Sequence, residues 1–192
     1  TCLSDPVWVE KYLEMRREKP PRPTDSSIFI GAQIGNLSDT DGYDAVMHSE
    51  VLTFSGVKKD TDPSELTVGS ARIVYTEDLP CRFVIKTVGP KWQDGKHGEG
   101  EYLASCYRTA LILAAEHGAR SIAFLPVSVG VHDFPTEFGA KIAVRTVVEF
   151  VLKNPGVFGK IGWIVKTEQE LEICRAQIER YDLDRLAETV DF

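Results

Sequence analysis

The feature that most constrains this chain is the alternation, from residue 70 onward, of short apolar runs with longer amphipathic segments. The runs typical of strands are residues 70–76, 82–89, 121–127 and 160–167, and the segments with helical spacing are residues 98–118, 136–151 and 168–180. Strands that alternate with helices of this length favour parallel pairing. The pattern predicts an α/β fold: a three-layer α/β/α sandwich with a central mixed, largely parallel sheet.

Local signals mark where these helices begin and end. Gly118 is a natural stop for the first of them, and Thr136 is placed to cap the second. Thr167 followed by Glu170 predicts a capping box at the start of the last helix. Lys141, Arg145 and Glu149 recur at i, i+4 spacing and predict a polar face on the second helix.

The first third of the chain has a different character. Asp5 and Pro6 predict the start of an amphipathic helix, and the prolines of "PPRPT" then forbid its continuation. We therefore expect two parts: an N-terminal helix and proline-rich arm over residues 1–24, and a domain over residues 25–192.

Within that domain, two segments precede residue 70. Residues 26–33, "SSIFIGAQ", form a short isoleucine-rich run that predicts a strand. Residues 42–56 have helical spacing, and Gly56 is placed to end a helix. The expected order is therefore a strand followed by a helix.

Composition limits the classes of function. The chain has 192 residues, 43% of them hydrophobic, which suffices for one domain with its own core. A formal net charge of -7 opposes broad attraction to nucleic acid or to an anionic membrane, so neither is expected as a partner. No apolar run approaches the roughly 20 residues of a membrane span, and no basic-then-apolar signal pattern is seen. We expect an intracellular, cytoplasmic protein; the first residue is Thr1 rather than Met, which leaves open that residues precede it.

The cysteines do not indicate metal or redox chemistry. They are far apart and show no CxxC pairing; they are Cys2, Cys81, Cys106 and Cys174. In patterned segments a thiol acts as a small hydrophobic group. We expect reduced, structural cysteines, no metal and no cofactor.

The stretch "SIAFLPVSVGVHDFP", residues 121–135, carries the strongest functional signal. It joins a buried strand to a helix, and Gly130 permits a close backbone approach that a Cβ would forbid. Free backbone N–H groups beside a helix N-terminus form a site for phosphate. A tight turn without a ligand remains the alternative on these residues alone.

Longer motifs around this loop resemble a known family. "VIKTVGPKW", then "YLASCYRTALILAAEHGARSIAFLPVSVGVHDFP", then "AKIAVRTVVEFV" resemble the second half of a macrodomain, the ADP-ribose-binding α/β fold. The family pattern there is close to "VIHTVGPxW", "SIAFPxISTGVYGYP" and "A..IA..TV..F". The resemblance runs from about residue 70 to residue 180. It implies that Ser128, Val129, Gly130 and Val131 wrap the diphosphate and the proximal part of ADP-ribose with backbone amides.

The first half resembles the family less closely. The family strand, loop and helix "IVNAANxxLxGGGGVDGAIHxAAG" can be laid on "IFIGAQIGNLSDTDGYDAVMHSEVLTFSG", which retains Asp44 and His48. By this resemblance Asp44 orients the water that attacks the distal ribose, as a carboxylate at a helix start is suited to do. An ordinary acidic residue in a first helical turn is the alternative for Asp44. His48 is expected to be a satisfied core histidine.

The departures from the family pattern bear on the ligand. The family asparagine that contacts the distal ribose falls on Ile34, with Gln33 and Asn36 as neighbouring substitutes. The glycine run becomes "SDTDG", where Asp39 and Asp41 add negative charge near a diphosphate. The upstream strand with the family "GDI" aspartate, which recognises adenine, is not found.

The second loop also departs from "STGVYG", since it reads "SVGVHD" here. Val129 lacks a hydroxyl, His132 replaces a tyrosine that packs near the distal ribose, and Asp133 adds a charge. His132 could donate to a phosphate or supply acid-base chemistry, or it could be an exposed loop histidine. The candidate ligand-binding residues are Gln33, Asn36, Ser128, Val129, Gly130, Val131, His132 and Phe134, and the candidate catalytic residue is Asp44.

Three functions follow from this resemblance. The first is a divergent macrodomain that binds ADP-ribose, a related nucleotide-like ligand or an ADP-ribosylated protein. The second is a mono-ADP-ribosyl hydrolase that uses Asp44, and the third is a protein-interaction scaffold with a closed ligand site. The oligomeric state stays open.

Overall fold

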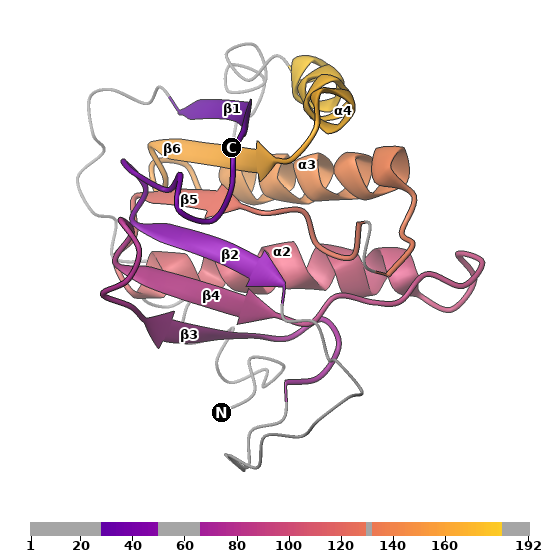
Figure 1. The fold of residues 1–192 in the computed structure, drawn as a ribbon, viewed down its shortest axis with the longest axis horizontal. Coiled ribbons are helices and arrows are strands. Elements are labelled where there is room, and N and C mark those ends of the chain that lie inside the picture. Colours follow the sequence, from indigo (N-terminus) through magenta and orange to yellow (C-terminus); the bar gives the residue numbers. More distant parts are fainter. Residues whose placement is uncertain (1–27, 50–65, 130–131, 182–192) are drawn as a thin grey trace.

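A computed structural model describes residues 28–49, 66–129 and 132–181 of the chain. Six strands form one sheet: β1 (Phe29–Ile34), β2 (Ala45–Ser49), β3 (Ala71–Tyr75), β4 (Phe83–Thr87), β5 (Ser121–Phe124) and β6 (Lys160–Val165). The strand order is β1-β6-β5-β2-β4-β3, and only the β3–β4 pair is antiparallel. The expected α/β class with a mixed, largely parallel sheet is confirmed (Figure 1).

Three described helices accompany the sheet: α2 (Glu99–Glu116), α3 (Thr136–Lys153) and α4 (Glu168–Glu179). The capping box of α4 is confirmed, since Thr167 Oγ1 accepts the Glu170 N–H at 3.2 Å and the Glu170 carboxylate accepts the Thr167 N–H. The predicted Thr136 cap is wrong, because Pro135 occupies the N-cap position and Thr136 is the first helical residue. Pro135 makes no side-chain cap hydrogen bond, and its carbonyl accepts the Gly139 N–H at 2.8 Å.

The two faces of the sheet are packed differently. The helices contribute their buried residues to one core, which contains Ala45 and Met47 from β2 together with Phe83 and Ile85 from β4. A second, smaller cluster on the opposite face contains strand and loop residues; they are Tyr43, Val46, Cys81, Val84, Ala123 and Ile164. Within the described ranges the buried residues of all three helices therefore pack on one face of the sheet. In Figure 1, α2 and α3 lie behind the strands, and α4 lies beside β1 and β6.

The helix predicted over residues 42–56 is wrong in its described part. Residues 45–49 form strand β2, which lies between β4 and β5 and pairs in parallel with both. Ala45, Val46 and Met47 are fully buried because both faces of this central strand are covered. A strand that is buried on both faces has no alternation of apolar and polar residues. By residue spacing alone, such a short apolar run cannot be told from a buried helical segment.

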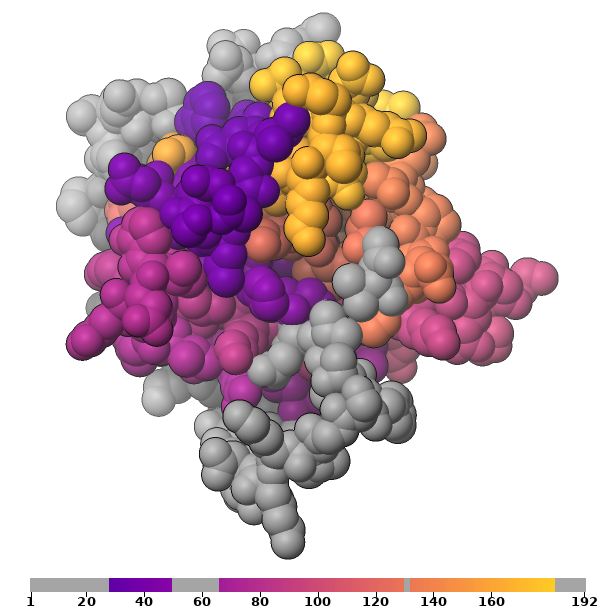
Figure 2. Space-filling model, viewed as in Figure 1, coloured from indigo at the N-terminus to yellow at the C-terminus, as the bar shows by residue number. Residues whose placement is uncertain are grey.

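Two further sequence predictions fall on residues that the structure describes, and the prediction for the N-terminal arm does not. The strand predicted over residues 26–33 is found as β1, an edge strand that lies beside α4 (Figure 2). Cys81, Cys106 and Cys174 are buried free thiols. The N-terminal helix and the proline-rich arm lie outside the described residues. Across the ranges that are described, no helix combines the length and apolar character needed to cross a membrane.

Candidate functional site

The candidate site is the segment that follows β5 and leads into α3. Because β5, β2, β4 and β6 are parallel, their carboxyl ends meet at one edge of the sheet, and this segment begins at that edge. Leu125 continues the pairing, since its N–H donates to the Met47 carbonyl of β2 at 3.0 Å. In the part that is described, the segment therefore lies beside the ends of two neighbouring strands, where parallel α/β sheets place their ligands.

Ser128 shapes this segment. Its backbone is left-handed, with φ 63°, and so is that of Asp133, with φ 55°. The Ser128 carbonyl accepts the His132 N–H at 3.1 Å and the Phe134 N–H at 3.3 Å. A left-handed non-glycine residue persists only where the surroundings hold it in place, so this turn is a constrained one.

The Ser128 hydroxyl is buried, and within the described residues it has no hydrogen-bond partner. A buried hydroxyl without a partner costs free energy, on the order of 1–3 kcal/mol. The turn therefore leaves one buried polar group of the described residues unsatisfied near the end of β5.

Gly89, in the turn after β4, packs directly against the same loop. A Cβ built on Gly89 would overlap Ser128 Oγ and Val127 Cγ1. The Ser128 and Val127 side chains therefore pack against the Gly89 backbone at a distance that only glycine allows. The same turn holds the other end of the segment, since the Trp92 N–H donates to the His132 carbonyl at 2.9 Å.

Aromatic side chains flank the loop. The Trp92 ring centroid lies 4.9 Å from that of Phe134 and 5.9 Å from that of Phe138. The Phe134 and Phe138 rings stack at 5.9 Å. Phe134 is buried, but 42% of Phe138 is exposed, which gives the cluster an open apolar surface beside the loop.

A small cavity of about 30 Å³ lies beneath the loop, between α3, β6 and α4. Its walls include Val127 and Val129 from the loop, Gly139 from α3, Trp163 from β6 and Cys174 from α4. This volume admits a water molecule but not a nucleotide.

The structure brings four of the predicted site residues together. Ser128, Val129, His132 and Phe134 belong to one segment, and hydrogen bonds or ring contacts link three of them. The Val129 side chain faces Gly139 at the start of α3. Gly130 and Val131 lie outside the described residues.

Gln33 and Asn36 lie at the same edge of the sheet but at a distance along it. β1 is parallel to β6, and β6 separates it from β5, so Gln33 is two strands away from the loop strand. The Asn36 side chain is engaged in its own turn, where its Oδ1 accepts the Ser38 N–H at 2.9 Å. The Asp39 carboxylate accepts the Asn36 N–H at 2.8 Å.

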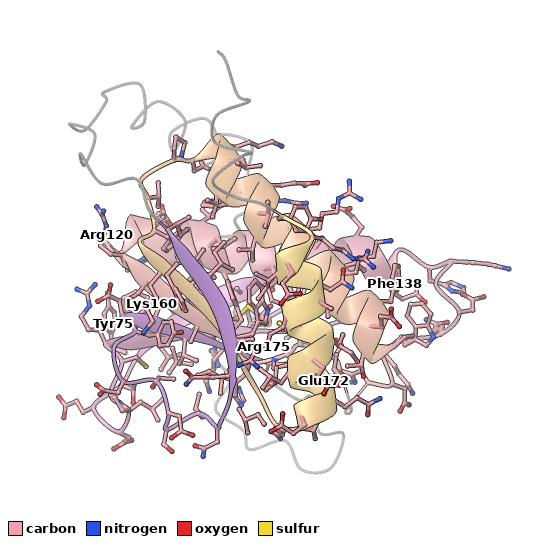
Figure 3. All side chains as sticks on the ribbon, turned by 90° about the horizontal axis from the view of Figure 1, so that it is seen from above. Tyr75, Arg120, Phe138, Lys160, Glu172 and Arg175 are labelled. Carbon is pink, nitrogen blue, oxygen red and sulfur yellow. The ribbon has the colours of Figure 1, made fainter. Side chains whose placement is uncertain are left out.

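Asp44 lies at the opposite edge of the sheet. It immediately precedes β2, and its Oδ2 accepts the backbone N–H groups of Arg120 at 2.7 Å and Ser121 at 3.2 Å. Its Oδ1 is 3.4 Å from Arg82 Nε. These contacts join the amino ends of β2 and β5, and the structure does not bring Asp44 together with the Ser128 loop. Figure 3 shows the two ends, with Arg120 far from Phe138.

Because residues 45–49 form a strand, the carboxyl end of β2 lies at the same edge of the sheet as the carboxyl end of β5. The helix predicted for these residues did not place them there. His48 and Ser49 form the carboxyl end of β2, next to Leu125 at the start of the loop. The prediction of a helix over residues 42–56 did not indicate that His48 and Ser49 lie at this edge. The signal that could have revealed it was the shortness of the apolar run "AVM", which is more typical of a buried strand than of a helix.

One described cluster has donor atoms suited to a metal. Asp94, His97 and Glu99 bring one ligand atom each within 4.8 Å of one another. However, the Glu99 carboxylate already accepts backbone N–H groups from four residues, at 2.7 to 3.3 Å; the donors are Gln93, Asp94, Gly95 and His97. Glu99 thus closes the loop before α2, and this bonding accounts for the cluster without an ion.

Comparison with known proteins gives the family. The family model described as "Macro domain" matches residues 53–143. A macro domain-containing protein of Chlorobaculum tepidum is 44% identical over 105 residues, which are 55% of this chain and 60% of that protein. The chain thus spans less than two thirds of the length of this relative.

Two relatives match over more of their length. An O-acetyl-ADP-ribose deacetylase of Klebsiella pneumoniae is 47% identical over 158 residues, which are 80% of this chain and 89% of that protein. A deacetylase of the same description from Escherichia fergusonii is 36% identical over 130 residues, which are 66% of this chain and 73% of that protein.

Solved structures share the fold. The Oceanobacillus iheyensis macrodomain with ADP superposes with a TM-score of 0.70 at 24% identity, covering 83% of this chain and 95% of that chain. The Trypanosoma brucei macrodomain in complex with ADP gives a TM-score of 0.67 at 24% identity, covering 88% of this chain and 86% of that chain. With the relatives above, this likeness shows that the chain belongs to the macrodomain family.

Proposed function

We propose that this protein binds ADP-ribose, or a related nucleotide-like ligand, over the loop that follows β5. The observation that carries the proposal is the constrained turn at Ser128, with its left-handed backbone and its buried hydroxyl. The turn lies between the end of a parallel strand and the N-terminus of α3, where backbone N–H groups and the helix dipole favour a diphosphate.

Two further features support this proposal. The aromatic cluster of Trp92, Phe134 and Phe138 offers an apolar surface on which a base or a sugar can pack. In addition, ADP is present in solved structures of two proteins with this fold, from Oceanobacillus iheyensis and Trypanosoma brucei.

A thermal-shift titration with ADP-ribose tests the proposal. The parent protein should be stabilised, by about 1.4 kcal/mol for each tenfold excess of ligand over Kd. Gly130→Glu, which places a carboxylate in the loop, should remove this response. Ala176→Glu adds the same charge at an exposed position of α4 and should preserve it. If ADP-ribose does not raise the melting temperature of the parent protein, the binding proposal is wrong and the scaffold function replaces it.

A second candidate function is hydrolysis of an ADP-ribose ester or of a mono-ADP-ribosyl group. It is supported by the relatives described as O-acetyl-ADP-ribose deacetylases, which are 36% and 47% identical to this chain. The sequence assigns the attacking water to Asp44, but this residue lies at the opposite edge of the sheet from the Ser128 loop, and its carboxylate is engaged with Arg82 and with two backbone N–H groups. The geometry therefore does not favour Asp44 in this role.

An assay of ADP-ribose release from a modified acceptor separates binding from hydrolysis. If Asp44 acts in catalysis, Asp44→Ala should lower the rate at least 100-fold while ADP-ribose still binds. Arg82→Ala, which removes the partner of the ion pair and keeps the carboxylate, should retain most of the rate. Turnover that survives Asp44→Ala would exclude Asp44 from the chemistry, and its contacts with β5 would then be purely structural.

A further inference from the structure

The cavity of about 30 Å³ beneath the Ser128 loop has walls of mixed character. Most of its lining is apolar and comes from the loop, α3 and β6; these residues include Val127, Val129, Ala143 and Val165. Three further side chains each bring a polar atom to the wall: Tyr107 of α2, Trp163 of β6 and Cys174 of α4. The cavity therefore lies where a strand and the helices meet under the loop.

Trp163 has an unpaired polar atom at this position. Its side chain is 2% exposed, and its Nε1 is buried without a hydrogen-bond partner among the described residues. An indole N–H can only donate, so it needs an acceptor to offset the cost of its desolvation. The ring is packed in the core, with its centroid 5.5 Å from that of Phe124. The Trp163 N–H is therefore held inside the protein rather than free to turn toward solvent.

The Tyr107 hydroxyl lies close to this N–H. Burial raises the pKa of Tyr107, while the Val127 backbone and the Trp163 side chain, which lie near the hydroxyl, act in the opposite direction. The Trp163 N–H nevertheless forms no direct hydrogen bond with the hydroxyl. The two groups are thus near enough for one oxygen atom to bridge them.

The charge of the lining selects the class of ligand. Burial raises the pKa of the Cys174 thiol to about 12, so the sulfur stays protonated and is a weak donor or acceptor. None of the residues that line the cavity is a cation. The one carboxylate in the lining, that of Glu170, already accepts the Lys166 N–H at 2.8 Å and the Thr167 N–H at 3.2 Å. The cavity therefore suits a small neutral molecule rather than an ion.

Size and bonding identify this molecule as water. The volume of about 30 Å³ exceeds the roughly 10–15 Å³ that one water needs, and a buried water typically makes about three hydrogen bonds. We propose that the cavity binds one water molecule, which accepts from Trp163 Nε1, donates to the Tyr107 hydroxyl oxygen and contacts the Cys174 thiol. This water joins β6 to α2 under the Ser128 loop, and it does not depend on ADP-ribose binding.

A crystal structure of the full chain tests this site. It should show one density peak within hydrogen-bond distance of both Trp163 Nε1 and the Tyr107 hydroxyl, with and without ADP-ribose. A cavity without density, in a structure that resolves ordered waters elsewhere, would overturn the inference. A direct hydrogen bond from Trp163 Nε1 to a protein atom would overturn it as well.

Nuclear Overhauser spectra of the full chain test the same site in solution. The indole proton of Trp163, assigned by its loss in Trp163→Phe, should give a cross-peak with water that has the sign of a long-lived complex. Tyr107→Phe removes one partner of the water with little change in volume and should weaken this cross-peak by about twofold or more. Cys174→Ala, which removes another partner, serves as the second variant if Tyr107→Phe does not fold.

Tyr102→Phe is the matched control, because it removes a hydroxyl from the same helix at a residue that is 48% exposed. It should leave the cross-peak unchanged. A parent protein whose Trp163 indole proton shows no cross-peak with water, or a folded Tyr107→Phe variant with an equal cross-peak, would contradict the bridge.

Discussion

At the scale of single residues, Glu99 shows how one buried carboxylate organises a loop. Desolvation raises its pKa, but hydrogen bonds from its own backbone N–H and from those of His97, Gly95 and Gln93 outweigh this and lower it to about 2. The loop before α2 is therefore closed around an anion that stays charged over nearly the whole pH range.

The lowered pKa predicts how stability depends on pH. A carboxyl group whose pKa falls from 4.5 to about 2 on folding contributes stability that is complete above pH 4.5 and is lost as the pH falls toward 2. Glu99→Gln should therefore lower the melting temperature most at neutral pH, and its difference from the parent should shrink between pH 4.5 and pH 2.

The control is Glu101→Gln, two residues along the same helix, where the carboxylate is exposed. Its effect on the melting temperature should be small and nearly independent of pH. A difference between Glu99→Gln and the parent protein that stays constant down to pH 2 would contradict the assigned role of Glu99.

At the scale of elements, the turn after β4 and the loop after β5 are interlocked. Gly89 allows the turn to pack directly on Val127 and Ser128, while Trp92 bonds to the carbonyl of His132. The position of the candidate ligand loop thus depends on an element that contains none of the predicted ligand-binding residues.

Gly89→Ala should displace the loop, because the added methyl group overlaps Ser128 and Val127. We expect a loss of stability of roughly 1–3 kcal/mol and a decrease in ADP-ribose affinity of at least about tenfold. Calorimetric titration and thermal unfolding of the same sample measure both quantities.

Gly118→Ala provides the matched control. Gly118 has φ +72°, so alanine there costs about 1 kcal/mol, but a Cβ would meet no atom within 4 Å. This variant should lose stability and keep its affinity for ADP-ribose. If Gly89→Ala also kept the parent affinity, the loop would not depend on the turn.

Strand β2 shows where prediction from the sequence failed. Its first three residues are buried although they alternate between the two faces of the sheet, and pairing with β4 and β5 decides their conformation. Both partner strands are distant in the sequence, so the spacing of residues near β2 does not reveal them. The error placed Asp44 at the start of a helix near the ligand, whereas its carboxylate joins the amino ends of two strands.

At the scale of the whole molecule, the second half of the fold was predictable because its elements are long and carry clear boundaries. Helices α2 and α3 have 18 residues each, and α4 begins with a capping box that Thr167 and Glu170 already suggest in the sequence. The Ser128 loop was predictable for the same reason, since it lies between a buried strand and a long helix. The packing of Ser128 and Val127 on Gly89 was not, because it joins a turn and a loop that are far apart in the sequence.

The most direct test of the central claim is isothermal titration of the parent chain with ADP-ribose. The proposal predicts a saturable heat of binding with one ligand per chain, which Gly130→Glu abolishes and Ala176→Glu preserves. Binding that is unchanged in a folded Gly130→Glu variant, or no heat in the parent protein at millimolar ADP-ribose, corresponding to a binding free energy weaker than about -4 kcal/mol, would contradict it.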